Sequence, residues 1–321
     1  MAKRLFRLKW LNGWLLFALL AIFINSFMIM KLVTLDLASP QVISEMIQYS
    51  VRWAVPFIFL VTATSALFTL FPSDGSRWLL RNRRYVGLSF AVAMAWQGAF
   101  IFIVSSLHSE HYYGEIYLLR DELEGSSGYL FLTAMTLTSF GLFRRHLTPH
   151  QWTFLHRAGV YFLWAYPFSV YWWNVFYYQT QHWWDISLYC FGFSAFALRI
   201  FAWRHVSAPP SALWAPQRII GTGIILGALA LAASGHLWQP LVSATLLRSA
   251  WSSDLELWLP FWPFEPFIPL LVLSVGMWVR RGRASADEFE FAKAKMNERY
   301  SDYVSGTPQK ASARPAATAN H

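Results

Sequence analysis

Eight long apolar runs recur along the chain, and they constrain its fold more than any other feature. They begin near Leu11, Val51, Tyr85, Gly128, Phe154, Asp185, Ile219 and Trp258. Each is close to the roughly 20 residues that a helix needs to cross a bilayer. Backbone groups in lipid must pair within their own segment, so each run is expected to be helical. Only 13% of the residues are charged, against about 25% in a soluble domain. The sequence therefore predicts an all-α membrane protein, a polytopic bundle of about eight transmembrane helices.

The basic residues predict which ends of these helices face the cytoplasm. With the N-terminus placed inside, 22 of the 26 Lys and Arg residues fall on one side. They lie in the N-terminal segment, in 77–84, in 144–157, in 199–218 and in the C-terminal tail. Such asymmetry follows the positive-inside rule, so both termini are predicted to be cytoplasmic. It also accounts for the net charge of +9 without a nucleic-acid partner.

Composition divides the chain into four parts. Residues 1–50 are expected to hold the first transmembrane helix and an outer loop, and residues 51–235 the transmembrane core. Residues 236–283 are expected to hold an outer segment lying along the membrane interface, then the last transmembrane helix. Residues 284–321 form a polar cytoplasmic tail that is expected to be partly disordered. The acidic stretch HSEHYYGEIYLLRDELEGSSG is interpreted as a solvated outer loop, or else as a surface that docks a cation or a partner.

His156 is the residue most open to a chemical role. The sequence has no Gly-rich phosphate loop, dinucleotide fingerprint or Cys/His metal cluster, so any electron donor would be a separate redox protein or a membrane quinol. His156 lies about two residues into the fifth run, beside Arg157 and ahead of Tyr161 and Trp164. An imidazole there is either a haem ligand in the inner leaflet or an interfacial hydrogen-bonding side chain.

Two blocks of sequence resemble the ferric reductase-like transmembrane domain family, most closely its bacterial haem-binding membrane subunits of the methionine sulfoxide reductase system. The blocks are FPSDGSRWLLRNRRYVGLSFAVAMAWQGAFIF and LTSFGLFRRHLTPHQWTFLHRAGVYFLW. The second carries the matching residues Thr138–Ser139, Arg144–Arg145, Trp152, Leu155–His156–Arg157 and Tyr161. The resemblance covers the second to sixth runs. It implies a ferric reductase-like core within 51–235 and a place in the bacterial cytoplasmic (inner) membrane.

The resemblance also implies b-type haem held by histidines on the third and fifth helices. The inner pair of positions is Gln97 and His156, and the outer pair is His111 and Ser169. Positions about fourteen residues apart on a helix are separated by roughly 20 Å, which is one haem per leaflet. Two of the four expected ligands are thus missing, because glutamine and serine are poor donors to haem iron. The third and fifth helices are expected to pack together, with Gln97 and His156 facing one another across a cavity.

These departures leave two main interpretations. In the first, the chain is an electron-transfer oxidoreductase subunit that holds haem b through His156 and His111. In the second, it keeps the family fold without haem and serves as a membrane scaffold or partner subunit. A small-molecule transporter is a third class, and it calls for ionisable residues in mid-membrane. Only Glu265 comes near that position, and it is expected at the outer interface.

Overall fold

The computed structural model describes residues 8–35, 38–179, 182–207, 215–246 and 258–281, with Phe6, Trp251, Ser252, Leu255 and Ala294. The described residues form helices and turns, with no strand among them. The long helices are α2 (Gly13–Val33), α3 (Pro40–Leu70), α4 (Asp74–Leu107), α6 (Leu119–Leu137), α8 (Pro149–Phe176), α9 (Trp183–Ser207), α10 (Ala215–Ala233) and α13 (Ile268–Arg281). The short ones are η1 (Lys9–Leu11), α5 (Ser109–His111), the π-helix η2 (Tyr112–Ile116), α7 (Gly141–Arg144), α11 (Gly235–Leu246) and η3 (Glu265–Phe267). Apart from Ala294, the predicted tail 284–321 lies outside the described residues.

Five helices in the described part are long and apolar enough to cross a membrane. They are α2, α3, α4, the Trp183–Trp203 part of α9 and the Pro216–Ala233 part of α10. Helix α6 opens with the acidic Asp121 and Glu122, and α8 is rich in tryptophan and tyrosine rather than aliphatic residues. The 14 residues of α13 reach only about 21 Å, short of a hydrocarbon core of about 30 Å. The membrane character is therefore supported, and the count of eight spans stays a prediction.

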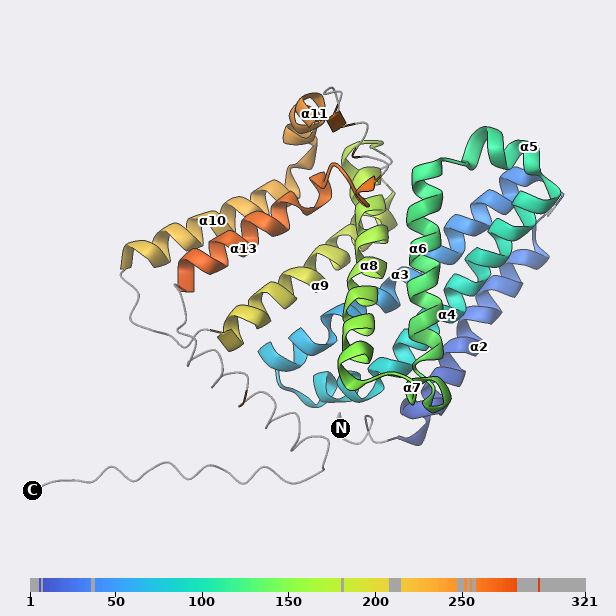
Figure 1. The fold of residues 1–321 in the computed structure, drawn as a ribbon, viewed down its shortest axis with the longest axis horizontal. Helices are drawn as coiled ribbons and strands as arrows, with labels where there is room; N and C mark the ends of the chain where they lie inside the picture. Colours follow the sequence, from blue (N-terminus) through green and yellow to red (C-terminus); the bar gives the residue numbers. More distant parts are fainter. Residues whose placement is uncertain are drawn as a thin grey trace, which may run out of the picture.

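Helix α3 holds the bundle together. It packs against α4, α8 and α9, while α2 lies on α4 and α6 lies on α8. Helices α10 and α13 form a hairpin whose α13 side rests on α9. Successive long helices run in alternating directions, and α6 stands between α4 and α8 (Figure 1). The core is aromatic at its centre, where Phe59, Phe168 and Trp172 are fully buried.

The basic loops gather at one end of the bundle, here called the basic end. Asn12 Oδ1 accepts a hydrogen bond from Asn82 Nδ2 at 3.2 Å, which joins the start of α2 to α4. The Trp14 ring stacks on Phe140 beside α7, with centroids 6.0 Å apart, and the Arg84 guanidinium lies 5.3 Å over Trp14. The N-terminal segment, the start of α4 and the α6–α8 connection therefore lie together, as the charge pattern indicates. Which side of the membrane this end faces stays a prediction.

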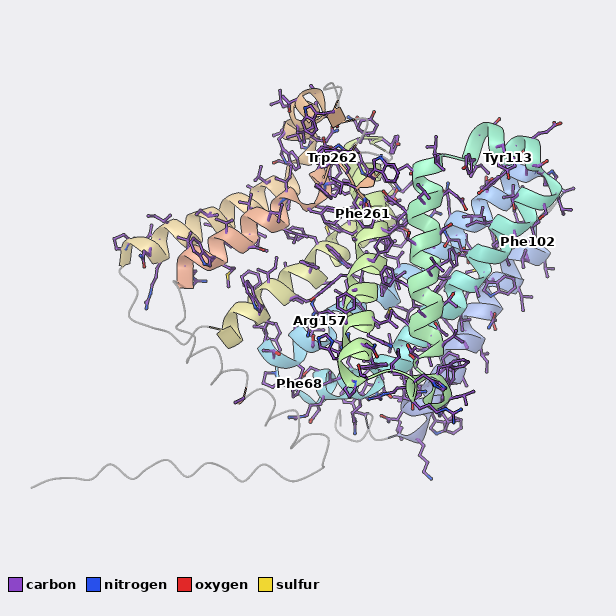
Figure 2. The ribbon with its side chains drawn as sticks, viewed as in Figure 1. Phe68, Phe102, Tyr113, Arg157, Phe261 and Trp262 are labelled. Atoms are coloured by element: carbon purple, nitrogen blue, oxygen red, sulfur yellow. The ribbon has the colours of Figure 1, made fainter. Side chains whose placement is uncertain are left out.

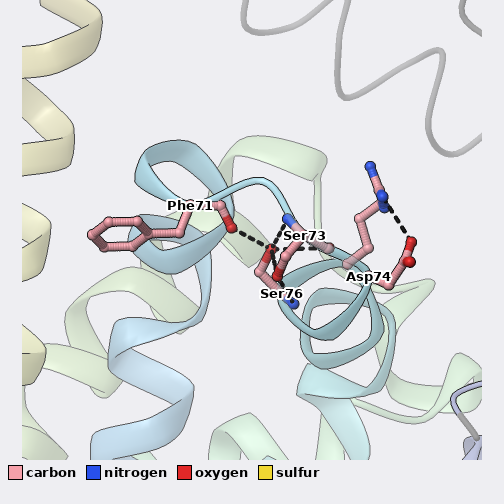
Figure 3. A network of polar contacts seen from close by, with 5 residues as sticks. Phe71, Ser73, Asp74 and Ser76 are labelled. Atoms are coloured by element: carbon pink, nitrogen blue, oxygen red, sulfur yellow. Dashed lines mark hydrogen bonds and ion pairs between the residues drawn. The ribbon is translucent and has the colours of Figure 1, made fainter. Parts of the chain in front are cut away.

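Short polar motifs start the helices at the basic end. At the turn between α3 and α4, Ser73 Oγ accepts from the Ser76 backbone N–H at 3.2 Å, and Ser76 Oγ accepts from the Ser73 N–H at 2.9 Å (Figure 3). Ser76 also donates to the Phe71 carbonyl at 2.8 Å, which closes the end of α3 (Figure 3). Thr148 and Gln151 make the same reciprocal cap at the start of α8. Each cap satisfies backbone donors that a helix start leaves unpaired.

Two boundaries differ from the sequence-based expectation. Helix α3 begins at Pro40 instead of near Val51, so much of the expected outer loop in 1–50 is helical. Proline favours the first helical position, and Ile43 and Met46 of this segment are fully buried, so packing extends the helix through a polar stretch. Arg199, expected in a loop, lies inside α9. The expected interfacial segment corresponds in its first part to α11.

Candidate functional site

His156 lies near the start of α8, and its Nε2 atom already has a hydrogen-bond partner. Its Nε2 is 3.0 Å from Oγ1 of Thr138, the residue that caps the C-terminal end of α6. The single hydroxyl hydrogen of Thr138 is donated to the Ala134 carbonyl at 2.6 Å. We therefore assign the proton of the contact to His156 Nε2. A metal-ligating imidazole nitrogen must be unprotonated with a free lone pair, so this nitrogen is committed to Thr138.

The ring of His156 is also held from its own helix. It packs on Trp152, one turn earlier, with ring centroids 4.3 Å apart. Trp152 Nε1 donates to the Thr138 carbonyl at 3.3 Å, and the Arg144 guanidinium lies 4.7 Å over the Trp152 ring. His156 thus belongs to a cluster that ties the end of α6 to the start of α8.

Gln97 lies on α4 and is engaged by a tyrosine of α6. The Tyr129 hydroxyl lies 3.1 Å from both Gln97 Oε1 and the Met94 carbonyl oxygen, to which it donates. A Cβ added at the next residue, Gly98, would lie 3.4 Å from that hydroxyl. The phenol of Tyr129 therefore occupies the space beside α4 at this level.

Gln97 and His156 are not brought together. Both contact α6, but at Tyr129 and Thr138, which are nine residues apart in the sequence. At 1.5 Å per residue the two levels are separated by about 13 Å along α6. Two axial ligands of one iron must face each other at the same level, so the expected pairing across a cavity is wrong. The expected direct packing of α4 on α8 is replaced by contacts of each with α3 and α6.

The interface between α6 and α8 is closed just above His156. A Cβ added at Gly159 would overlap the Met135 sulfur and would lie 3.3 Å from Phe131 Cδ1. The absent side chain of Gly159 lets the two helices approach closely. Dense packing of this kind leaves no space for a macrocycle beside His156 on its α6 side.

The outer pair is separated as well. His111 ends α5, and its Nδ1 lies 3.5 Å from Glu115 Oε2. A pocket of about 390 Å³ beside it is lined by the consecutive residues 107–111 and opens at the end of α4. Ser169 is buried in α8, where its hydroxyl donates to the Tyr166 carbonyl at 2.8 Å. Helix α5 packs on α4 and η2, apart from α8 (Figure 1).

Aromatic side chains fill the bundle at the level of Ser169. Trp164 stacks on Phe168 and donates its indole N–H to the Gly192 carbonyl at 3.0 Å. Phe267 of η3 lies against Phe168, with centroids 5.7 Å apart. Phe261, which precedes η3, lies beside α8 (Figure 2), and its ring centroid is 5.1 Å from that of Phe162.

The residues present do not fit haem b. Each proposed ligand has a partner within the chain, and the spaces next to Gln97, Gly159 and Ser169 are filled by neighbouring side chains. No group of three or more His, Cys, Asp or Glu residues that could hold a metal ion occurs in the described part of the chain. The Thr138 contact and the α6 packing had no signal in the sequence, because both depend on which helices become neighbours.

No protein-family model, curated protein or solved structure matches the chain. The ferric reductase-like resemblance therefore rests on the residues quoted above.

The structure also shows two ionisable residues packed among the helices. Glu265 is fully buried within the protein, and its expected place at the outer interface stays a prediction. Its Oε1 accepts from Ser243 at 2.8 Å, and Ser243 accepts from Gln239 at 2.6 Å. Glu265 Oε2 has no hydrogen-bond partner among the described residues. Arg199 is the second, inside a span of α9; a lone basic residue within an apolar run was the signal that the sequence offered.

Proposed function

We propose that this chain is a haem-free membrane subunit whose helical bundle acts as a scaffold or partner subunit in the bacterial cytoplasmic membrane. One observation supports this most. Gln97, His156, His111 and Ser169 lie at separate places, and each bonds to a residue of its own chain. A chain that needed these positions for iron would keep two of them opposed across an open space.

Internal hydrogen bonds make the bundle suited to a structural role. Trp96 Nε1 donates to Asn25 Oδ1 at 2.8 Å and joins α4 to α2. The Tyr189 hydroxyl donates to the Ala232 carbonyl at 2.8 Å and joins α9 to α10. Each interhelical bond of this kind contributes about 1 kcal/mol in a membrane. A rigid surface presented to another subunit is a function that needs packing and no cofactor.

The competing function is electron transfer through haem b, with a separate redox protein or quinol as partner. It follows from the family resemblance, and the two missing histidines and the filled interior count against it. The two functions share a fold, so the fold does not choose between them.

Complementation of a deletion strain separates the two functions. The double variant His156→Phe and His111→Phe keeps an aromatic ring beside Trp152 and removes both histidines that the family resemblance assigns to haem. A scaffold predicts full complementation at normal protein level. An electron-transfer subunit predicts the null phenotype at the same protein level, which would refute the proposal.

Two glycine variants calibrate that experiment. A Cβ at Gly192 would lie 2.7 Å from Phe59 and 3.0 Å from Phe168, where α9 meets α3 and α8. Gly192→Val is therefore expected to disrupt the bundle and fail to complement. Gly223→Val is the matched control, because a Cβ there meets nothing within 4 Å, and it is expected to complement.

A further inference from the structure

Arg199 is a cation placed within an apolar helix. It lies 16 residues beyond Trp183, the first residue of α9, or about 24 Å along the helix axis. Trp183 is largely exposed, at 73%, as tryptophans of the membrane interface are. The hydrocarbon core is about 30 Å thick, so Arg199 lies within reach of the headgroups at the basic end. A long arginine side chain extends toward that boundary.

The guanidinium contacts three helices. Nη1 donates to the Thr62 carbonyl of α3 at 3.0 Å and to Ser65 Oγ at 3.3 Å. Nη2 donates to the Tyr161 hydroxyl of α8 at 2.7 Å. These contacts fix the group where α3, α8 and α9 pack together. All three acceptors are neutral.

The guanidinium also lies 4.9 Å over the Tyr161 ring, but no described anion neutralises its charge, and part of its hydrogen-bonding capacity is unused. A guanidinium has five N–H donors, and the described residues accept from three of them. No described carboxylate lies within 4 Å of Arg199. The Tyr161 hydroxyl accepts from Arg199, and its own hydrogen has no acceptor among the described residues. Such an arrangement favours a ligand that is anionic and carries several acceptor oxygens.

A second arginine and exposed apolar side chains lie on either side. Arg157 is exposed one turn before Tyr161 on α8, and it has no ion pair with a described residue. Figure 2 places Arg157 on the lower part of α8, the helix on which α9 packs. Phe154 on α8 is 70% exposed and Trp203 on α9 is 56% exposed. Basic groups next to exposed apolar surface match a phosphate with acyl chains attached.

We propose that Arg199, Tyr161 and Arg157 bind the phosphate of an anionic phospholipid in the leaflet at the basic end of the bundle. Arg199 and Tyr161 supply the N–H and O–H donors that remain, and Arg157 adds charge at the headgroup level. Basic sites between transmembrane helices on the cytoplasmic side bind anionic headgroups by this chemistry. A free phosphate shares that chemistry, but it gains nothing from Phe154 and Trp203. The site does not depend on whether haem is bound.

The test is lipid binding by the full chain in a neutral detergent, followed by native mass spectrometry. Phosphatidylglycerol should bind about ten-fold more tightly than phosphatidylcholine, and Arg157→Gln should weaken it about five-fold. Arg157→Gln leaves the Arg199 contacts intact, so a folding defect is not expected. Tyr161→Phe keeps the ring and should also weaken binding. Arg218→Gln, which removes an exposed arginine of α10, should leave binding unchanged.

Two results would overturn the proposal. Equal loss of phosphatidylglycerol in Arg157→Gln and Arg218→Gln, with binding unchanged in Tyr161→Phe, would show a general charge effect without a site. Displacement of bound phosphatidylglycerol by inorganic phosphate at millimolar concentration would show that a soluble anion is the ligand. Arg199→Lys keeps the charge but loses the forked donors, so unchanged binding by that variant would remove the assigned role of the guanidinium.

Discussion

Replacing Gly159 by alanine tests whether α6 and α8 touch where a haem would otherwise lie. In an open helix this change stabilises by about 1 kcal/mol. Here the new Cβ overlaps the Met135 sulfur and lies 3.3 Å from Phe131. Overpacking of a filled interior costs about 1–3 kcal/mol. The net effect expected for Gly159→Ala is a loss of up to about 2 kcal/mol in the free energy of unfolding.

A double-mutant cycle isolates the contact. Met135→Ala removes the side chain that the new Cβ meets, so Gly159→Ala in that background should stabilise by up to about 1 kcal/mol. The sign of the Gly159→Ala effect should thus reverse between the two backgrounds. Gly227→Ala is the control, because a Cβ there meets nothing within 4 Å. It should stabilise equally in both.

Unfolding by SDS titration in mixed micelles measures the stability of all six proteins. If Gly159→Ala stabilises the wild type as much as Gly227→Ala does, the helices do not touch at Gly159. The α6–α8 interface would then be open at this level, and the conclusion that no haem fits beside His156 would be wrong.

Three further outcomes are expected. The Tyr112 hydroxyl donates to Glu122 at 2.9 Å, and burial together with Glu122 raises the pKa of Tyr112 from 10.0 to about 12. The stabilisation by the neutral phenol is complete below pH 10 and is lost between pH 10 and 12, so the wild type should lose about 1 kcal/mol of folding stability over that window. An equal loss in Tyr112→Phe would contradict this assignment. Glu265 has no described cation beside it and should be uncharged. Glu265→Gln should therefore lower the free energy of unfolding by less than about 1 kcal/mol, and Glu265→Ala by about 2–3 kcal/mol. Equal thermal destabilisation by the two variants would indicate that a charged carboxylate is required. In a Cys190→Ser background, Arg81→Cys should resist and Glu115→Cys should accept an impermeant thiol reagent added to intact cells; the reverse would invert the topology.

The helical class and the grouping of the basic loops were predictable because they depend on local properties. Apolar runs demand helices in lipid, and capping residues such as Ser73 and Thr148 mark helix starts. The start of α3 was predicted too late, because Ile43 and Met46 are buried by neighbouring helices in an otherwise polar stretch. Periodicity alone does not reveal such packing.

The candidate site was less predictable because it depends on which helices are neighbours. The spacing of Gln97, His111, His156 and Ser169 fits a two-helix pattern along the sequence. In the structure, Gln97 and His156 each form a hydrogen bond with a different residue at α6, Gln97 with Tyr129 and His156 with Thr138. Arg199 was assigned to a loop because basic residues usually mark span ends. Its contacts with Thr62 and Tyr161 bring together residues far apart in the sequence.

A visible absorption spectrum of the purified protein, expressed with ample haem, tests the central claim most directly. The account predicts no Soret band, no reduced-minus-oxidised difference, and no low-spin haem spectrum when Gln97→His restores the family residue. His156→Ala should then give the same spectrum as the wild type. A Soret band with close to one haem per chain, lost in His156→Ala, would contradict the haem-free account and establish the electron-transfer function in its place.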